Sequence, residues 1–121
     1  MLLNCLCVGA GGALGAVCRY LIGLIPLEEH GFPLKTLIVN VAGAFAIGLI
    51  AALATRGKGW DPHLLLLLKV GVCGGFTTFS TFAFETSALL QGGSVGMALG
   101  YVLTSLVLGV LAVFGAMALV R

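Results

Sequence analysis

The residues with the most distinctive chemistry lie together at positions 74–82, which read Gly-Gly-Phe-Thr-Thr-Phe-Ser-Thr-Phe. Each glycine lowers helix stability by about 1 kcal/mol. The hydroxyl side chains of this segment compete with the backbone for hydrogen bonds; they belong to Thr77, Thr78, Ser80 and Thr81. We therefore predict that a helix through Gly74 and Gly75 unwinds locally. Freed carbonyl groups of such a half-helix can coordinate a cation, and freed N–H groups can meet an anion.

The two later phenylalanines of the segment, Phe79 and Phe82, are three residues apart and are expected to project along one face of a helix. Ordinary apolar packing is the commoner role of phenylalanine. The edge of an aromatic ring also has partial positive charge, so it can face an anion without binding it strongly. The spacing is compatible with both roles.

Further polar residues interrupt the other apolar stretches. Asn40 has two N–H donors and an acceptor, so it either bridges helices or contacts a passing ion. Tyr101, Thr104 and Ser105 lie on one helical face, where their hydroxyls bond to the protein backbone or face a polar path. Arg19, about six residues from the end of its stretch, either snorkels to the interface or attracts anions at a vestibule.

The four cysteines, at positions 5, 7, 18 and 73, lie in apolar surroundings without Cys-x-x-Cys spacing or a nearby histidine. Small packing residues are the expected role, rather than metal ligands or disulfides. No nucleophile and base pair can be assembled from the sequence, so an enzyme is not expected.

The elements that position these residues must lie in lipid. Of the 121 residues, 60% are hydrophobic and 8% are charged, and the mean hydropathy is +1.21. Because a membrane helix needs about 20 apolar residues, we predict four spans, at residues 2–25, 34–55, 64–90 and 95–120. These spans make a single four-helix transmembrane domain over residues 1–121. A net charge of +2 is too small to indicate nucleic acid as a partner.

The distribution of Lys and Arg gives little preference for one orientation in the membrane. Arg56, Lys58 and Arg121 fall on the side shared by the termini and the middle loop, against Arg19 and Lys35 near the first loop. Lys69 lies inside the third span. Insertion in both directions would allow an antiparallel dimer. Glycines four apart favour close helix packing, from which we expect oligomerisation; they are Gly11 and Gly15, Gly71 and Gly75, and Gly92, Gly96 and Gly100.

Three ordered segments resemble the signature segments of the Fluc fluoride channels, the CrcB family. They are Gly-Gly-Ala-Leu-Gly-Ala-Val-Cys-Arg-Tyr at 11–20, Thr-Leu-Ile-Val-Asn-Val-Ala-Gly at 36–43, and Gly-Val-Cys-Gly-Gly-Phe-Thr-Thr-Phe-Ser-Thr-Phe at 71–82. The resemblance extends across nearly the whole chain.

What the resemblance implies is an all-α membrane protein with a broken third helix, assembled as an antiparallel, dual-topology homodimer. Two separate fluoride pores would run along the subunit interface. Backbone carbonyls of Gly74 and Thr77 from both copies would hold a structural sodium ion. The residues that match pore positions are Asn40, Phe79, Phe82, Ser80, Thr81 and, less closely, Tyr101 and Ser105.

By the same resemblance Arg19 matches the vestibule arginine and Glu85 matches a recurring acidic position. Gly109 stands where a further serine is expected, so the polar track should be shorter here. The implied function is passive fluoride export across a bacterial plasma (inner) membrane. Fluoride enters the cell as neutral HF, is trapped inside as the anion, and would leave through the channel. A selective path must replace lost water with hydrogen-bond donors and still release the ion.

A small multidrug-resistance-type, proton-coupled transporter is the alternative, because it is also a four-span antiparallel dimer of this size. Its proton coupling requires a carboxylate inside the first span, and this sequence has none there. Glu85, on the third span, is the only acidic residue well inside any span.

Overall fold

The computed structural model describes residues 1–27, 30–57 and 59–120. Four helical spans are long and apolar enough to cross a membrane: Leu2–Gly23, Leu34–Arg56, Pro62–Gln91 and Val95–Leu119. The predicted all-α membrane fold is therefore confirmed for the described part of the chain. The predicted boundaries differ from these by at most two residues.

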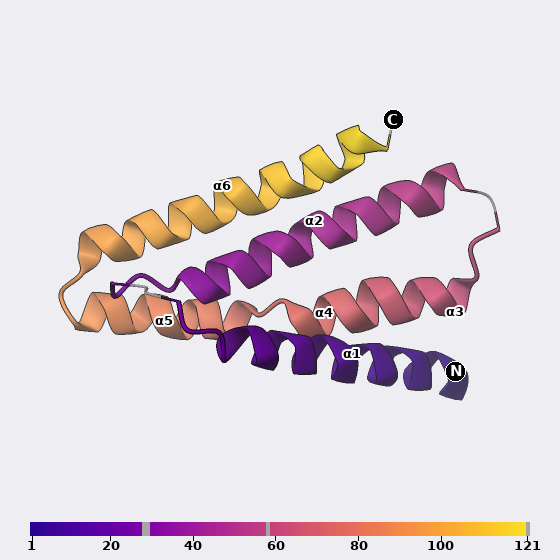
Figure 1. Cartoon of the computed structure of the whole chain (residues 1–121), viewed down its shortest axis with the longest axis horizontal. Coiled ribbons are helices and arrows are strands. Elements are labelled where there is room, and N and C mark those ends of the chain that lie inside the picture. The colour runs from indigo at the N-terminus through magenta and orange to yellow at the C-terminus, as the bar shows by residue number, and fades with distance from the viewer. Residues whose placement is uncertain (28–29, 58, 121) are drawn as a thin grey trace.

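The spans alternate in direction along the long axis of the molecule (Figure 1). Helix α1 (Leu2–Gly23) leads by the first loop to α2 (Leu34–Arg56), and α6 (Val95–Leu119) ends the described chain. Both termini and the middle loop lie at one end of the molecule, as predicted, and the first and third loops lie at the other. Lys58 and Arg121, which the sequence analysis assigned to the termini end, lie outside the described residues.

The third span is built from several pieces. It begins at Asp61, whose Oδ1 accepts a hydrogen bond from the His63 N–H at 2.9 Å, with Pro62 at the first helical position. The pieces are α3 (Pro62–Leu65), the π-helix η1 (Leu66–Val72), α4 (Cys73–Phe76) and α5 (Phe79–Gln91). The sequence analysis did not anticipate the π-helical turn.

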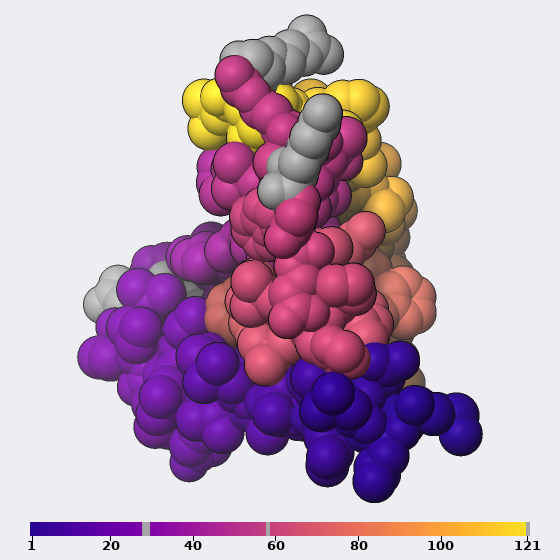
Figure 2. Space-filling model, turned by 90° about the vertical axis from the view of Figure 1, so that its right-hand side faces the viewer, coloured from indigo at the N-terminus to yellow at the C-terminus, as the bar shows by residue number. Residues whose placement is uncertain are grey.

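The helices pack as two close pairs. Helix α2 packs on α6, where a methyl group added to Gly48 would lie 3.0 Å from the Val113 Cα. Helix α1 packs on η1 and α4. Viewed from the termini end, α1 lies along one edge, α6 lies along the opposite edge, and the third span lies between them (Figure 2).

The two glycine pairs, Gly11/Gly15 and Gly71/Gly75, allow close helix packing inside the subunit. A methyl group added to Gly71 would lie 2.8 Å from the Gly11 Cα, and one on Gly75 would lie 2.9 Å from the Gly12 Cα. One on Gly15 would lie 2.7 Å from the Phe76 nitrogen. The close helix packing expected of these glycines is therefore confirmed within the subunit, where α1 meets the third span, and the expected oligomerisation stays a prediction. Gly96 and Gly100, in contrast, face open space.

A candidate ion pathway around the broken third span

The third span breaks at Thr77 and Thr78, both of which have extended backbone (φ −79°, ψ 156° and φ −145°, ψ 117°). The predicted local unwinding of segment 74–82 is therefore confirmed, although Gly74 and Gly75 themselves remain helical in α4. Hydroxyl side chains determine where the helix begins again after the break. Thr78 Oγ1 accepts a hydrogen bond from the Thr81 N–H at 3.2 Å and so caps the N-terminus of α5.

Asn40 of α2 is bonded to the backbone at this break. Its Nδ2 donates to the Thr78 carbonyl at 3.0 Å, and its Oδ1 accepts from the Thr78 N–H at 2.8 Å. Of the two roles left open for Asn40, the structure shows the bridge between helices. The amide thereby satisfies both backbone groups of a residue that has left its helix.

Arg19 of α1 lies on the other side of the break and is half-buried. Its Nε donates to the Gly75 carbonyl at 3.3 Å, which satisfies one of the carbonyl groups at the end of α4. The charge is therefore placed next to the break, and it also lines the cavity described below. Arg19 combines an anchoring contact with the cation expected near a vestibule.

The surroundings of Gly74 fit a site for a hard cation. In an unbroken helix the Thr78 N–H would donate to the Gly74 carbonyl, but here it donates to Asn40. Gly74 is exposed, and a methyl group added to it would meet nothing within 4 Å. No group of three or more His, Cys, Asp or Glu side chains suited to a metal occurs within the described ranges. The Gly74 carbonyl has therefore lost the Thr78 N–H as its helical donor, and backbone carbonyl oxygens are of the kind that hard cations bind.

The aromatic side chains form a short chain along α5 toward α6. The ring centroids of Phe79 and Phe82 are 6.0 Å apart, and those of Phe82 and Tyr101 are 5.0 Å apart. Phe32 of the first loop stacks edge-on against Tyr101 at 5.5 Å. Tyr101 is fully buried, whereas Phe79 is 79% exposed. The chain of rings therefore extends from the interior to the outer surface of the subunit.

A cavity of about 270 Å³ lies beside these rings. It brings together four predicted pore residues and two threonines of the break, and is lined by Asn40, Thr77, Thr78, Phe79, Phe82, Ser105 and Leu106. The Ser105 hydroxyl is buried and has no hydrogen-bond partner within the part of the chain that the structure describes. Because an unpaired buried hydroxyl is unfavourable, it is available to a polar species in this cavity.

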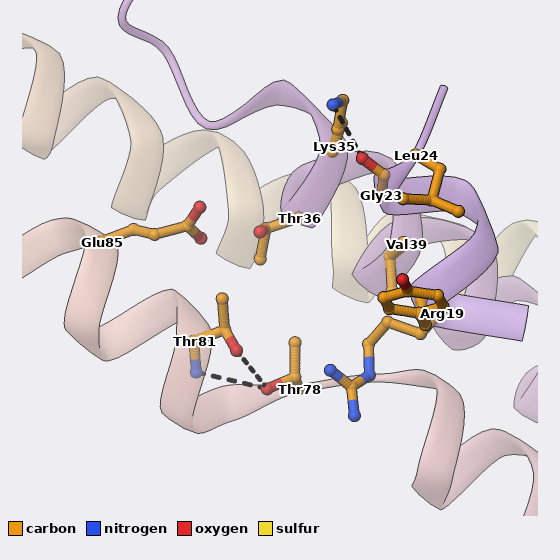
Figure 3. A pocket seen from close by; sticks show the side chains of 10 residues that line it. Arg19, Gly23, Leu24, Lys35, Thr36, Val39, Thr78, Thr81 and Glu85 are labelled. Atoms are coloured by element: carbon orange, nitrogen blue, oxygen red, sulfur yellow. Dashed lines mark hydrogen bonds between the residues drawn. The ribbon is translucent and has the colours of Figure 1, made fainter. Parts of the chain in front are cut away.

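A second cavity, of about 410 Å³, lies on the first-loop side of the break (Figure 3). Glu85 and Thr36 point into it from α5 and α2, and Arg19 lies beside the extended segment. The Tyr101 hydroxyl donates to Glu85 Oε1 at 3.1 Å. Thr36, which is 9% exposed, was not singled out from the sequence, although its place four residues before Asn40 puts it on the same helical face.

Some of the remaining predicted residues lie at these cavities and others do not. Thr81 belongs to the hydroxyl cluster, since its Oγ1 accepts from Thr78 Oγ1 at 3.0 Å, and it lines the 410 Å³ cavity. Ser80 is exposed, with its Oγ 3.5 Å from Thr78 Oγ1. Thr104 is half-buried and lines neither of these two cavities. The free cysteines include Cys73, which is buried beside the break.

Known proteins are similar to this chain over nearly its whole length. A family model described as CrcB-like protein, Camphor Resistance (CrcB), matches residues 6–117. A protein of Rhizobium meliloti (strain 1021) named fluoride-specific ion channel FluC is 48% identical over 118 residues, which cover 96% of this chain and 94% of the relative. A protein of the same name from Chlorobium phaeobacteroides (strain BS1) is 44% identical over 117 residues, which cover 96% of this chain and 91% of the relative. This chain belongs to the CrcB family.

Proposed function

We propose that this protein is a passive, fluoride-selective ion channel. The observation that supports the proposal most directly is the meeting of Asn40, Phe82 and the unpaired Ser105 hydroxyl at one cavity beside the break. Relatives named fluoride-specific ion channels, similar over nearly the full length, supply the identity of the ion.

The side chains around the break suit an anion that must be held and then released. Ser105 offers a hydroxyl donor, and the edges of Phe79 and Phe82 offer partial positive charge. None of them has a full charge, so the anion is not trapped. Arg19, at the margin of the larger cavity, would raise the local anion concentration.

We propose that the working unit is an antiparallel homodimer with two pores. Within one subunit Phe79 is 79% exposed and Gly74 faces open space, so the break lies at the surface. Irregular backbone at membrane depth is tolerated only where protein or a wet cavity covers it. A second copy would provide that cover and complete the walls of each pore.

A structural sodium ion would be held by the carbonyls of Gly74 and Thr77 from both copies. When bound, the ion supplies a fixed positive charge on the dimer axis, which stabilises assembly and favours nearby anions. Thr77→Val, which keeps the carbonyl, should therefore preserve sodium-dependent stability of the purified dimer. Loss of that dependence would contradict a backbone site.

The deciding experiment is fluoride efflux from proteoliposomes, followed with a fluoride electrode. Purified parent protein should release fluoride down its gradient, should not release chloride, and should be insensitive to an imposed proton gradient. Gradient-driven uptake of a lipophilic cation would instead support the small multidrug-resistance-type transporter. The names of the relatives and the position of Glu85, on the third span and bonded to Tyr101, do not favour that alternative.

We place the channel in the bacterial inner membrane as a multi-pass protein, where it would export fluoride trapped in the cytoplasm. Cells that lack their own fluoride exporter should gain fluoride resistance when they express the parent chain. The expected benefit depends on export, so it should be lost in the Phe79 and Phe82 variants described below.

A further inference from the structure

Two further cavities lie on the other side of the break, toward the termini end of the molecule. One, of about 540 Å³, includes Asn40, Gly74 and Thr77 in its wall. The other, of about 680 Å³, includes Asn4, Thr55 and Pro62. Lys69 and Val70 line both cavities, so the two spaces adjoin at these residues. Together they define a groove, the termini-side groove, from the break to the end seen in Figure 2.

Lys69 is the charged residue of this groove. Of the four Lys and Arg residues that the structure describes, the other three donate to backbone carbonyls: Arg19 to Gly75, Lys35 to Gly23 and Arg56 to Val120. Lys69 has neither an ion pair nor a hydrogen bond with any described residue, and it is exposed in the subunit. An ionisable side chain inside a span is costly in lipid, so it is expected to face protein or water.

The backbone around Lys69 is itself unusual. Lys69 lies in the middle of the π-helix η1 (Leu66–Val72). Single π-helical turns inside α-helices are rare and are frequent at functional sites. Helical side chains lean toward the N-terminus of their helix, so Lys69 is directed toward the termini-side mouth of the groove, which also includes the polar side chains of Asn4 and Thr55.

We infer that Lys69 is the anion-attracting group of a second approach to the break, from the termini side. The ligand is a small hydrated inorganic anion. Its identification as fluoride rests on the proposed function. Arg19 and Lys69 then stand on opposite sides of the break, one at each approach. Lys69 lies five residues before Gly74, a little over one helical turn. It concentrates anions without occupying the narrow cavity beside the rings.

The test compares fluoride efflux by the parent, Lys69→Met and Lys69→Arg in proteoliposomes over a range of fluoride concentrations. At low fluoride and low ionic strength, Lys69→Met should conduct about three- to fivefold less, as expected for one charge at close range. At saturating fluoride, or in about 1 M of an inert salt, the difference should disappear. Lys69→Arg should behave like the parent.

Arg56→Met is the matched control. It removes the same charge at the same end of the molecule, but Arg56 is not among the residues that line the termini-side groove, and its guanidinium is bonded to the Val120 carbonyl. Its efflux at low fluoride should equal that of the parent. Equal efflux by Lys69→Met and the parent at low fluoride and low salt, with the dimer intact, would overturn the assignment of Lys69.

A second measurement does not depend on conduction. Lys69→Cys in vesicles should react with an anionic, membrane-impermeant thiol reagent faster than the native cysteines of the parent chain. An unreactive cysteine at this position would overturn the proposal that the groove is open to water. A parent protein that releases no fluoride would instead overturn the proposed function, and the labelling would still report on the groove.

Discussion

At the scale of single residues, Asn40 decides whether the break in the third span is tolerated. It satisfies the Thr78 N–H and carbonyl at 2.8 and 3.0 Å. Asn40→Ala should lower the stability of the purified protein by about 1 to 3 kcal/mol, because two backbone groups lose their partners. Thermal unfolding in detergent measures the effect.

The control for Asn40 is Thr55→Val, also on α2, whose hydroxyl donates to the carbonyl of Ala51 in its own helix. It should unfold like the parent. If Asn40→Ala also unfolds like the parent, then another group satisfies Thr78, and the amide is free for a different role.

The two phenylalanines of the proposed pore should separate stability from conduction. Phe79→Ile and Phe82→Ile should both lower fluoride efflux and leave the dimer intact. Phe82→Ile should also cost about 1 kcal/mol, because its ring contacts both Phe79 and Tyr101. Phe79→Ile should cost little, since the side chain is 79% exposed in the subunit.

Phe84→Ile is the matched control for both variants. Phe84 lies on the same helix and is 76% exposed, but it is not in the wall of the 270 Å³ cavity. Size-exclusion chromatography and the fluoride electrode give the two readouts. Full conduction by both pore variants would refute the assignment of the rings.

Sequence reasoning at this scale singled out residues that the structure brings to one cavity, but it did not identify their partners. The types Asn, Phe, Ser and Tyr inside apolar stretches are visible in any sequence, because each is unusual there. Which backbone group Asn40 meets depends on how α2 lies against the break, and that packing is not encoded in local spacing. Thr36 was missed although it lies four residues before Asn40, because spacing alone does not show that this face of α2 borders a cavity.

At the scale of elements, the close approach of α1 to the third span depends on glycine. A methyl group added to Gly11 would lie 2.9 Å from the Gly71 Cα and would overlap the Leu67 carbonyl oxygen. Gly11→Ala should therefore lower stability by about 1 to 3 kcal/mol, since backbone atoms must move apart. The yield of monodisperse protein and its thermal unfolding measure this.

Gly9→Ala is the matched control on the same helix, because a methyl group there would meet nothing within 4 Å. It should be neutral or slightly stabilising, as alanine favours helix. A Gly11→Ala protein as stable as Gly9→Ala would show that α1 does not pack on the third span in the working protein.

The spans themselves follow from hydropathy, because a continuous run of apolar residues has few other solutions in lipid. The position of the break does not. The glycines and the hydroxyl residues after them predicted unwinding somewhere in segment 74–82, but not at which residue; Gly75 stays helical where it packs closely on Gly12. The break lies instead at Thr77 and Thr78, where Asn40 replaces the lost helical bonds. Tertiary packing overrode local propensity.

At the scale of the whole molecule, one subunit is an open array of helices. Large apolar side chains are exposed along all four spans, as suits lipid, yet the polar break and Phe79 also reach the surface. Gly96 and Gly100 of α6 face open space as well. This distribution supports a partner subunit. It does not fix the partner's direction, which in this chain depends on a nearly balanced set of charges.

The final prediction concerns that balance. Because orientation follows Lys and Arg near the ends of the spans, a double variant Ile25→Lys/Leu27→Lys should hold the first loop inside. A Lys-Lys extension after Arg121 should hold the termini inside. Both substituted side chains are exposed at the first-loop end. A reporter fused to the C-terminus should show one orientation for each variant and both orientations for the parent.

Each biased variant expressed alone should confer little fluoride resistance, because no antiparallel partner is made, and the two expressed together should restore it. The neutral variant Ile25→Gln/Leu27→Gln should resemble the parent, which separates charge from the loss of apolar side chains. Full resistance from one biased variant alone would mean that subunits inserted in the same direction form a working channel. In that case the open break of one subunit must be covered by a parallel neighbour.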